Sequence, residues 1–310
     1  MDPHGTSAIN LKQLIILIVT VCSLVWMLVM IALIGALWRA RPERTRPVEL
    51  DPRRERRMSG TVIAATFVTV IVISGFTLAS FFTTRALSLA GPDDLTIRVR
   101  GAQWWWNVEY LDPRPDKSFQ TANEIHIPVG RNVRFLLEGD DVIHSFWVPS
   151  LAGKQDLIPG RPNELSIRAK RAGIYRGQCA EFCGLQHAHM AFLVIADPQN
   201  VFDKWADGQR QPAVKPSDEE SAAGRDAFLG KACASCHTIR GTPASGTTGP
   251  DLTHVGSRKY IAAGLFETTR GSLAAWIADP QTLKPGNNMP MVPLTADELR
   301  SVSAYLASLK

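Results

Sequence analysis

Two stretches near the start of the chain are mostly hydrophobic and contain no charged residue. Gln13–Trp38 and Met58–Thr84 contain 26 and 27 residues without a charged side chain. Each exceeds the roughly 20 residues that a helix needs to cross a bilayer. A cleavable signal peptide would have a shorter apolar core and a more basic start. The pattern therefore predicts two retained membrane-spanning helices, at about 13–38 and 59–84.

Apolar and polar residues alternate in the middle of the chain. Leu95–Tyr110, Asn123–Leu137 and Glu164–Arg176 show this two-residue period and are separated by Gly and Pro turns. Many short strands without a long helix between them are typical of a β-sandwich or a barrel. We therefore expect an all-β domain in this region.

Helical signals return after a polar, Pro-containing stretch. Pro198–Ala206 can form a short helix over a sheet edge, and Gly208–Pro216 reads as a linker. Capping boxes are predicted at Ser217 with Glu220 and at Thr295 with Glu298, the second one opening a final helix to Leu309. We expect Phe228 of the first of these helices to contact Tyr305 or Leu306 of the last. The expected division is a hairpin at 1–90, a β domain at 91–197, a linker at 198–216 and a helical domain at 217–310.

The net charge of +5 is concentrated in one place. Eight arginines lie between positions 39 and 57, opposed by four carboxylates, whereas the two regions beyond position 90 are nearly neutral. A basic loop of this kind between two spans marks the cytoplasmic side. The loop 39–58 is therefore expected inside, both chain ends outside, and nucleic acid is excluded as the reason for the charge.

A dense set of soft ligands follows the third alternating region. The loop Cys179-Ala-Glu-Phe-Cys183-Gly-Leu-Gln-His187-Ala-His-Met190 offers two thiolates, an imidazole and a thioether, and His144 lies upstream. Sulfur mixed with imidazole selects copper, and a mononuclear blue-copper site needs only one cysteine. The second cysteine therefore suggests two bridged copper ions. A disulfide or a zinc site is the alternative, although zinc sites favour a closed set of four ligands.

A second motif lies fifty residues further on. Cys233-Ala-Ser-Cys236-His237 matches the attachment sequence of a c-type haem, in which the histidine binds the iron. A thioredoxin-like redox pair would need a βαβ context that is absent here. The second axial ligand is expected from a methionine downstream, with Met289 favoured and Met291 as the alternative. Cys22, in the first span, is expected to be a small packing residue.

These motifs together resemble subunit II of a caa-type bacterial cytochrome c oxidase over nearly the whole chain. The resemblance implies a multi-domain membrane protein: a two-helix transmembrane hairpin, a cupredoxin-like Greek-key β-sandwich and an all-α class I cytochrome c domain. It implies a binuclear copper centre, CuA, and one covalent haem c. The CuA ligands are then His144, Cys179, Glu181 through its carbonyl, Cys183, His187 and Met190; the haem residues are Cys233, Cys236, His237 and Met289.

The resemblance also implies roles for further residues. Trp104, in Gly-Ala-Gln-Trp-Trp-Trp, admits electrons to CuA, and the Glu181 carboxylate helps to hold a Mg ion shared with subunit I. Lys154–Arg161 faces subunit I. In the haem pocket, Pro250 orients the axial histidine, Arg258 meets a propionate, and Trp276 lies close by. Many subunits II have a glutamate inside the second span near a proton channel; here only Glu55 is near, which leaves its role open.

The implied function is electron transfer in a respiratory haem–copper oxidase. Electrons would pass from a soluble or membrane-bound cytochrome c, or from a cytochrome bc complex, through haem c to CuA and on to the haem of subunit I. Oxygen reduction and proton translocation would occur in the complex with subunits I and III, since this chain has no oxygen-reducing site. The implied location is the bacterial inner membrane, with both metal domains on the periplasmic side. A CuA subunit of a nitric oxide or nitrous oxide reductase is the alternative, and a thioredoxin-fold copper chaperone is the third.

Overall fold

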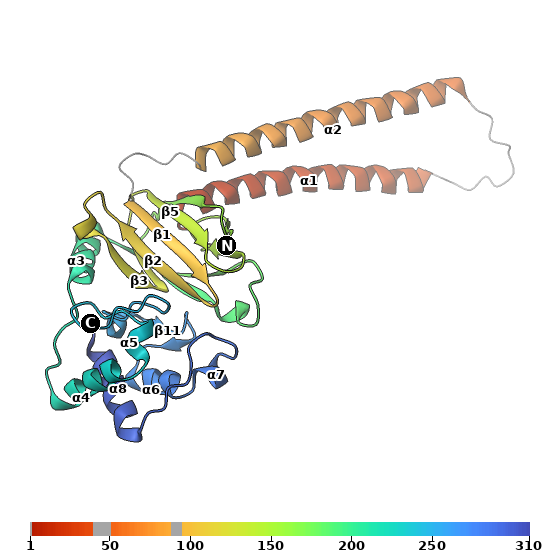
Figure 1. The fold of residues 1–310 in the computed structure, drawn as a ribbon. Coiled ribbons are helices and arrows are strands. Elements are labelled where there is room, and N and C mark those ends of the chain that lie inside the picture. Colours follow the sequence, from red (N-terminus) through yellow and green to blue (C-terminus); the bar gives the residue numbers. More distant parts are fainter. Residues whose placement is uncertain (1, 40–50, 88–94) are drawn as a thin grey trace. The chain divides into compact units, whose positions relative to one another are not determined.

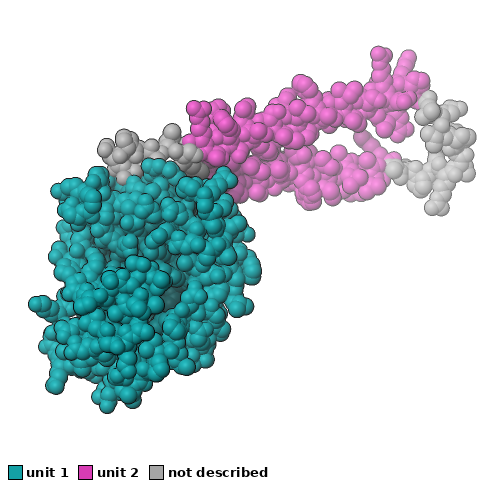
Figure 2. All heavy atoms as spheres, in the orientation of Figure 1, with its two compact units in different colours: residues 1–8, 90–310 teal, residues 9–89 magenta. Residues whose placement is uncertain are grey.

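A computed structural model describes residues 2–39, 51–87 and 95–310 (Figure 1). The chain forms two compact units, which Figure 2 colours separately. One unit contains residues 9–89, and the other contains residues 1–8 together with 90–310. The predicted order of two apolar helices, a β-sandwich and a helical domain is confirmed.

The first unit consists of two long helices, α1 (Thr6–Arg39) and α2 (Pro52–Leu87). Both are long and apolar enough to cross a membrane, and none of the side chains in their most apolar windows is buried within the protein. Such apolar exposure suits a lipid environment. Cys22 is exposed on α1. Most of the predicted basic loop, residues 40–50, lies outside the described residues, whereas Glu55 lies in the first turn of α2.

Ten strands form the β-sandwich, in two five-stranded sheets. Neighbouring strands are antiparallel except β1 with β5 and β10 with β4, which are parallel. The first sheet has the order β3 (Phe119–Ala122), β2 (Trp105–Leu111), β1 (Leu95–Ala102), β5 (Val133–Gly139) and β8 (Asn163–Ile167). The second has the order β4 (Glu124–Pro128), β10 (Ala191–Asp197), β9 (Gly173–Cys179), β6 (His144–Trp147) and β7 (Gln155–Leu157).

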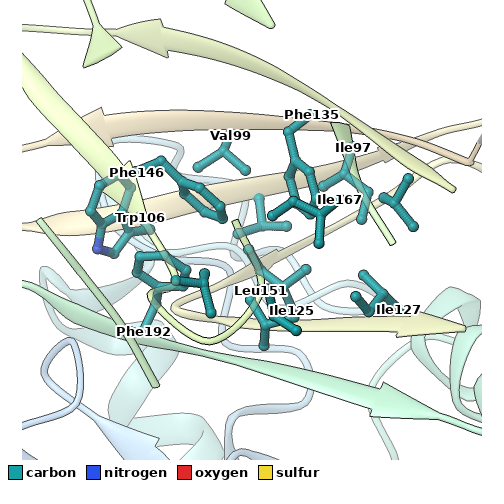
Figure 3. Packing of buried hydrophobic residues seen from close by; sticks show 14 of the residues in the cluster. Ile97, Val99, Trp106, Ile125, Ile127, Phe135, Phe146, Leu151, Ile167 and Phe192 are labelled. Atoms are coloured by element: carbon teal, nitrogen blue, oxygen red, sulfur yellow. The ribbon is translucent and has the colours of Figure 1, made fainter. Parts of the chain in front are cut away.

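Aromatic side chains occupy part of the core between the two sheets (Figure 3). The Phe146 and Phe192 rings stack with centroids 4.4 Å apart, and the Trp106 ring packs edge-on against both. Such aromatic pairs stabilise a core by more than the burial of their apolar surface alone would. Trp106 is therefore a core residue, whereas its neighbour Trp105 on the opposite face of β2 is half-buried.

Residues near the start of the chain pack on the same sandwich. The Gly5 N–H donates to the Ser150 carbonyl at 3.0 Å, and the Lys170 N–H donates to the His4 carbonyl at 2.8 Å. Gly5 also forms an isolated β-bridge with Ala169. A Cβ atom at position 5 would lie 2.0 Å from the Leu151 carbonyl oxygen, so only glycine fits here.

The stretch predicted as a linker, 198–216, is largely helical. Helix α3 (Gln199–Arg210) is longer than the expected Pro198–Ala206 because its apolar face is anchored to the sandwich. The Trp205 ring packs edge-on against Tyr110 and stacks on His126 at 4.1 Å. Only a few residues then remain to connect the two domains.

The C-terminal domain packs its first helix, α4 (Glu219–Gly230), against its last, α8 (Ala296–Ser308). The predicted contact between Phe228 and Tyr305 is confirmed, with ring centroids 6.4 Å apart. The remaining elements are α5 (Cys233–Cys236), α6 (Arg270–Ala278), α7 (Pro280–Leu283) and the small hairpin of β11 (Tyr260–Ile261) and β12 (Phe266–Glu267).

One predicted helix cap is confirmed and the other is wrong. Thr295 and Glu298 form the expected capping box at the start of α8. Helix α4 is capped by Asp218 instead of Ser217, since the Asp218 carboxylate accepts a hydrogen bond from the Ser221 N–H at 2.8 Å. A carboxylate also interacts favourably with the positive end of the helix, so the aspartate is the stronger cap of the two adjacent candidates.

Candidate metal centres

Sheet register brings the predicted copper ligands together. Phe146 of β6 pairs with Cys179 at the end of β9, and β10 pairs back onto β9. The loop between β9 and β10 therefore lies beside the start of β6, where His144 is found. His144 is the first residue of its strand, β6.

The two thiols lie at the centre of this group of side chains. Cys179 Sγ and Cys183 Sγ are 3.7 Å apart. His144 Nδ1 lies 3.9 Å from Cys179 Sγ, and His187 Nδ1 lies 3.6 Å from Cys183 Sγ. The ligand atoms of His144 and both cysteines lie within 4.8 Å of one another, and all three side chains are buried.

Two further donors complete the set. Met190 Sδ lies 3.8 Å from Cys183 Sγ, and the Glu181 carbonyl oxygen lies 3.2 Å from Cys179 Sγ. The Glu181 carboxylate points elsewhere, toward Lys154 Nζ at 3.3 Å, and is half exposed. Two thiols, two imidazoles, a thioether and a carbonyl form a soft, largely buried donor set, which suits copper bridged by thiolates. The residues fit the group that the sequence predicted.

Asp141 is a residue of this site that sequence reasoning missed. Its carboxylate accepts a hydrogen bond from His144 Nε2 at 2.8 Å, which leaves Nδ1 facing the thiols. The other carboxylate oxygen accepts from the Gln103 N–H at 2.6 Å. Such a partner fixes the tautomer and the ring orientation of a metal-binding histidine. Its position three residues before His144 was the only available signal.

Burial and mutual hydrogen bonding make the two thiols unequal. A hydrogen bond from Cys183 lowers the pKa of Cys179 to about 3, against the opposing effect of burial. The Cys183 thiol donates that hydrogen bond and is itself buried, so its pKa is raised. Burial pulls the pKa of His144 down, but hydrogen bonds to Cys179 and Asp141 raise it overall. One thiolate is therefore available for a metal ion at neutral pH.

Trp104 lies directly against the copper loop, residues 179–190. Its indole Nε1 donates to the Cys183 carbonyl at 2.9 Å, and the Gln103 side chain donates to the same oxygen at 2.7 Å. The neighbouring Gly184 has φ of +110°, and a Cβ there would lie 3.0 Å from the Trp104 ring. Glycine is therefore required for the ring to approach this closely.

A cavity of about 380 Å³ occupies the C-terminal domain. Every residue predicted to hold the haem lines it: Cys233, Cys236, His237, Pro250, Arg258, Trp276 and Met289. Trp104 from the β-sandwich lines it as well. Met291 does not, and its side chain is 63% exposed, so only Met289 is available inside the cavity.

His237 is oriented by the carbonyl of Pro250. His237 Nδ1 lies 2.8 Å from that oxygen, an arrangement in which Nδ1 donates and Nε2 is left free to bind a metal ion. Burial lowers the pKa of His237 more than this hydrogen bond raises it. The imidazole is therefore neutral at physiological pH, as a ligand must be.

Arg258 is a buried cation with an incomplete set of partners. Its Nη2 donates to the Asp251 carbonyl at 2.5 Å, while its Nε has no partner among the described residues. Burial lowers its pKa, although a guanidinium stays charged in proteins. An orphaned N–H on the wall of the cavity fits an acidic group of a bound haem.

Comparisons with known proteins agree with both centres. Residues 115–197 match the family described as cytochrome c oxidase subunit II, periplasmic domain, and residues 221–310 match the cytochrome c family. Cytochrome c oxidase subunit 2 of Alkalihalophilus pseudofirmus is 34% identical over 315 residues, covering 100% of this chain and 90% of its own. The subunit 2 of Bacillus sp. strain PS3 is 35% identical, covering 70% of this chain and 62% of its own.

A solved structure is also similar in part. The periplasmic domain of cytochrome oxidase subunit II from Bradyrhizobium japonicum is 31% identical, covering 39% of this chain and 97% of its own, with a TM-score of 0.37. The relationship is carried by the sequence match to A. pseudofirmus, which spans both metal domains and the helical hairpin. This chain therefore belongs to the cytochrome c oxidase subunit II family, in the form that carries a cytochrome c domain at its C-terminal end.

Proposed function

We propose that this chain delivers electrons from a donor to subunit I of the oxidase through a covalent haem c and a binuclear copper centre. Each group, when bound, accepts and releases one electron at a time. The observation that carries the proposal is the position of Trp104. Its ring lines the haem cavity, and its Nε1 donates to the carbonyl of Cys183. A single side chain thus contacts both sites.

The copper ligands are assigned to the converging donors. His144, Cys179, Cys183, His187 and Met190 bind through their side chains, and Glu181 binds through its carbonyl oxygen. Their separations of 3.2 to 3.9 Å around the two thiols support this assignment. The sandwich fixes the donors in advance, since Cys179 and Met190 flank paired strands and His144 is held by Asp141.

The haem is assigned to the cavity residues. Cys233 and Cys236 form the thioether bonds from the single turn of α5, and His237 and Met289 bind the iron. Two hydrogen bonds hold the methionine segment: the Met289 N–H donates to the Asn287 side chain at 2.8 Å, and its carbonyl accepts from Gln281 at 2.9 Å. Pro250 orients the histidine, Arg258 takes a propionate, and Trp276 packs on the porphyrin.

Trp104 is assigned as the residue that admits electrons to the copper centre. In this chain the indole is only 7% exposed, because the C-terminal domain covers it. The donor therefore meets the haem domain, and Trp104 receives electrons from within the chain. A soluble or membrane-bound cytochrome c, or a cytochrome bc complex, is the proposed donor.

We assign the surface around Glu181 as the place where electrons leave the copper centre for subunit I. The exposed carboxylate of Glu181 and the adjacent Lys154 lie at the end of the loop, with Asp156 3.8 Å from Lys154. Carboxylates with waters suit a Mg ion, so we assign Glu181 to a site shared with subunit I. The segment Lys154–Arg161 is the proposed contact with that subunit.

The proposed setting is the bacterial inner membrane, with subunits I and III in the same complex. The arginines between positions 39 and 57 support a cytoplasmic loop, and we therefore assign both metal domains to the periplasm. Oxygen reduction to water, with proton translocation, then occurs in the partner subunits. The proposed division is a hairpin at 1–90, the copper domain at 91–197, a connection at 198–216 and the haem domain at 217–310.

Rapid mixing of the assembled oxidase with reduced donor tests this order. The haem absorption bands should change before the near-infrared copper band. Replacing Trp104 by Phe removes the hydrogen bond to Cys183, so the copper band should follow the haem more slowly while both spectra keep their shape. Trp205→Phe, in the contact of α3 with Tyr110 and His126, is the matched control and should not change the delay. Copper reduction ahead of haem reduction would refute the proposed direction.

A further inference from the structure

The two metal domains are joined along one edge by hydrogen bonds that converge on the segment before Met289. The Gln186 side chain donates to the Pro285 carbonyl at 2.8 Å, and the Asn288 side chain donates to the Gln103 carbonyl at 3.3 Å. Glu124 of β4 accepts from the Lys259 N–H at 2.8 Å at a second point of contact. The methionine segment is therefore docked on the same backbone that surrounds the copper loop.

Lys284 lies at the centre of this junction and is only 2% exposed. Its Nζ donates to the Trp104 carbonyl at 2.8 Å, to the His189 carbonyl at 2.9 Å and to the Ala262 carbonyl at 3.0 Å. The first two acceptors belong to the copper domain and the third to the haem domain. One ammonium group thus joins three backbone segments from both domains.

The three acceptors match the chemistry of an ammonium group. Three carbonyls use the three hydrogens of the charged form, whereas a neutral amine has only two. Within residues 95–310 of the structure, no carboxylate forms an ion pair with Lys284. A buried cation without a counter-ion costs stability, and burial lowers its pKa to about 7. Simple packing would be served better by an apolar side chain.

We propose that Lys284 is the positioning residue that holds the haem domain against Trp104 and the copper loop in the geometry that electron transfer needs. This inference rests on the proposed function, because it assigns to one residue the docking on which the transfer between the two centres depends. The Lys284 ammonium group and its three carbonyl acceptors form what we call the clamp. It binds the Trp104 carbonyl, while the ring of the same residue contacts the haem cavity and the copper loop. Losing it would free Trp104 and the methionine segment together.

The positive charge has a second consequence at the copper site. Lys284 Nζ lies 2.9 Å from the carbonyl oxygen of His189, which belongs to the loop between Cys179 and Met190. A nearby cation favours the form of the centre that has gained an electron. The copper centre should therefore be easier to reduce with Lys284 present than without it.

Lys284→Met tests the clamp, because it keeps the length of the side chain and removes the charge and all three donors. In the full chain with Cys22→Ser, nitroxide labels at Arg171→Cys and Ala223→Cys report the distance between the domains in the fully reduced protein. Both label positions are exposed, one in each domain. We expect a broadened distance distribution in the variant. After photoreduction of the haem, transfer to copper should slow by at least about tenfold, as misplacement by an ångström can cost even more.

Two further variants separate docking from charge. Gln186→Leu removes the Gln186–Pro285 bond, so it should slow transfer to a smaller degree without lowering the copper potential. Lys284→Met should lower that potential as well as slow the transfer. Lys231→Met is the matched control, because Lys231 pairs with Glu298 within the haem domain and should change neither measurement. Gln186→Leu also keeps the proposal testable where Lys284→Met fails to bind its cofactors.

Two outcomes would overturn the proposal. The first is an unchanged transfer rate in Lys284→Met, whether or not the domain distance broadens. The second is an unchanged distance distribution in that variant. If copper in the unmodified chain receives no electrons from the haem while the distance distribution is narrow, the proposed function fails and the clamp stands.

Discussion

Two cysteine pairs in this chain have opposite surroundings. Cys179 and Cys183 are buried at the end of a sheet, where Met190, two histidines and a carbonyl face them. Cys233 and Cys236 are half-buried in one turn of helix on the wall of an open cavity. The first pair has its partners in place within the fold, and the second pair faces space that the fold leaves for a large group.

The difference extends to the protonation of the thiols. Burial raises the pKa of Cys233, and no second thiol offsets this. At the other pair, the Cys183 hydrogen bond lowers the pKa of Cys179. A site that binds a metal ion reversibly benefits from a cysteine that is already deprotonated. Covalent attachment of haem by cellular machinery needs only thiols that the machinery can reach. Similar spacing in sequence therefore conceals two different kinds of chemistry.

Removal of one cysteine from each pair gives the largest expected effect. Cys183→Ser should abolish the mixed-valence copper spectrum completely and leave the covalent haem bands unchanged, since a serine cannot bridge two copper ions. Cys236→Ser should weaken covalent haem attachment and leave the copper spectrum unchanged. Metal analysis and absorption spectra of the two variants measure both effects. Loss of both cofactors in either variant would show that the two sites are not independent.

The methionines near the haem give the next effect. Met289→Leu should convert the haem iron from low-spin to high-spin, because Met289 is the methionine that lines the cavity. Met291→Leu should leave the spectrum unchanged, as this side chain is largely exposed. Visible and magnetic circular dichroism spectra distinguish the two spin states. If the spin state changed in Met291→Leu and not in Met289→Leu, Met291 would be the methionine that binds the haem iron.

The difference in pKa between Cys179 and Cys183 predicts that the free energy of unfolding depends on pH in the chain without metal and haem. Cys179 has a folded pKa of about 3 and an ordinary value of 9.0, so the folded chain binds fewer protons between these values. Stability should therefore rise from pH about 3 toward 9, and the part due to this thiolate is lost as the pH falls through about 3. Above 9 it should fall again, because Cys183 retains its proton in the folded chain.

Ultraviolet absorbance of the thiolate and the unfolding midpoint follow this behaviour. One thiolate should be present at pH 6 in the chain with all cysteines, and none should be present in Cys179→Ser. The rise in stability should flatten in the same variant. Replacing Cys233 by Ser should alter neither curve in this range, because burial raises its pKa. A thiolate that persists in Cys179→Ser would contradict the predicted difference in pKa between Cys179 and Cys183.

Glu181→Gln is expected to have the smallest effect. The proposed copper ligand is the backbone carbonyl, which the substitution keeps, and the carboxylate is half exposed beside Lys154. The copper spectrum should be unchanged, and the stability should change by less than about 1 kcal/mol. Turnover with bound Mg in the assembled oxidase should fall if the carboxylate holds that ion. A lost copper spectrum would mean that the side chain is the ligand.

Local signals were enough to predict much of this molecule. The uncharged stretches, the alternation and the two cysteine motifs indicated the hairpin, the sandwich and both metal centres, because each leaves a recognisable local pattern in the sequence. The cap of α4 was placed one residue too early, since Ser217 and Asp218 are adjacent and both can cap. Asp141 and Lys284 were missed for another reason. Asp141 carries no motif that marks it as the partner of His144 three residues later, and Lys284 acts through a contact between domains that spans 180 residues.

The docking of residues 4–8 on the sandwich has a consequence for biogenesis. Their hydrogen-bond partners, such as Ser150 and Lys170, are synthesised some 145 residues later, which at cellular rates is a delay on the order of 10 s. Residues 4–8 can therefore dock only after the sandwich segments that bind them have been made. A side chain at Gly5 would clash with the Leu151 carbonyl and prevent this late docking step.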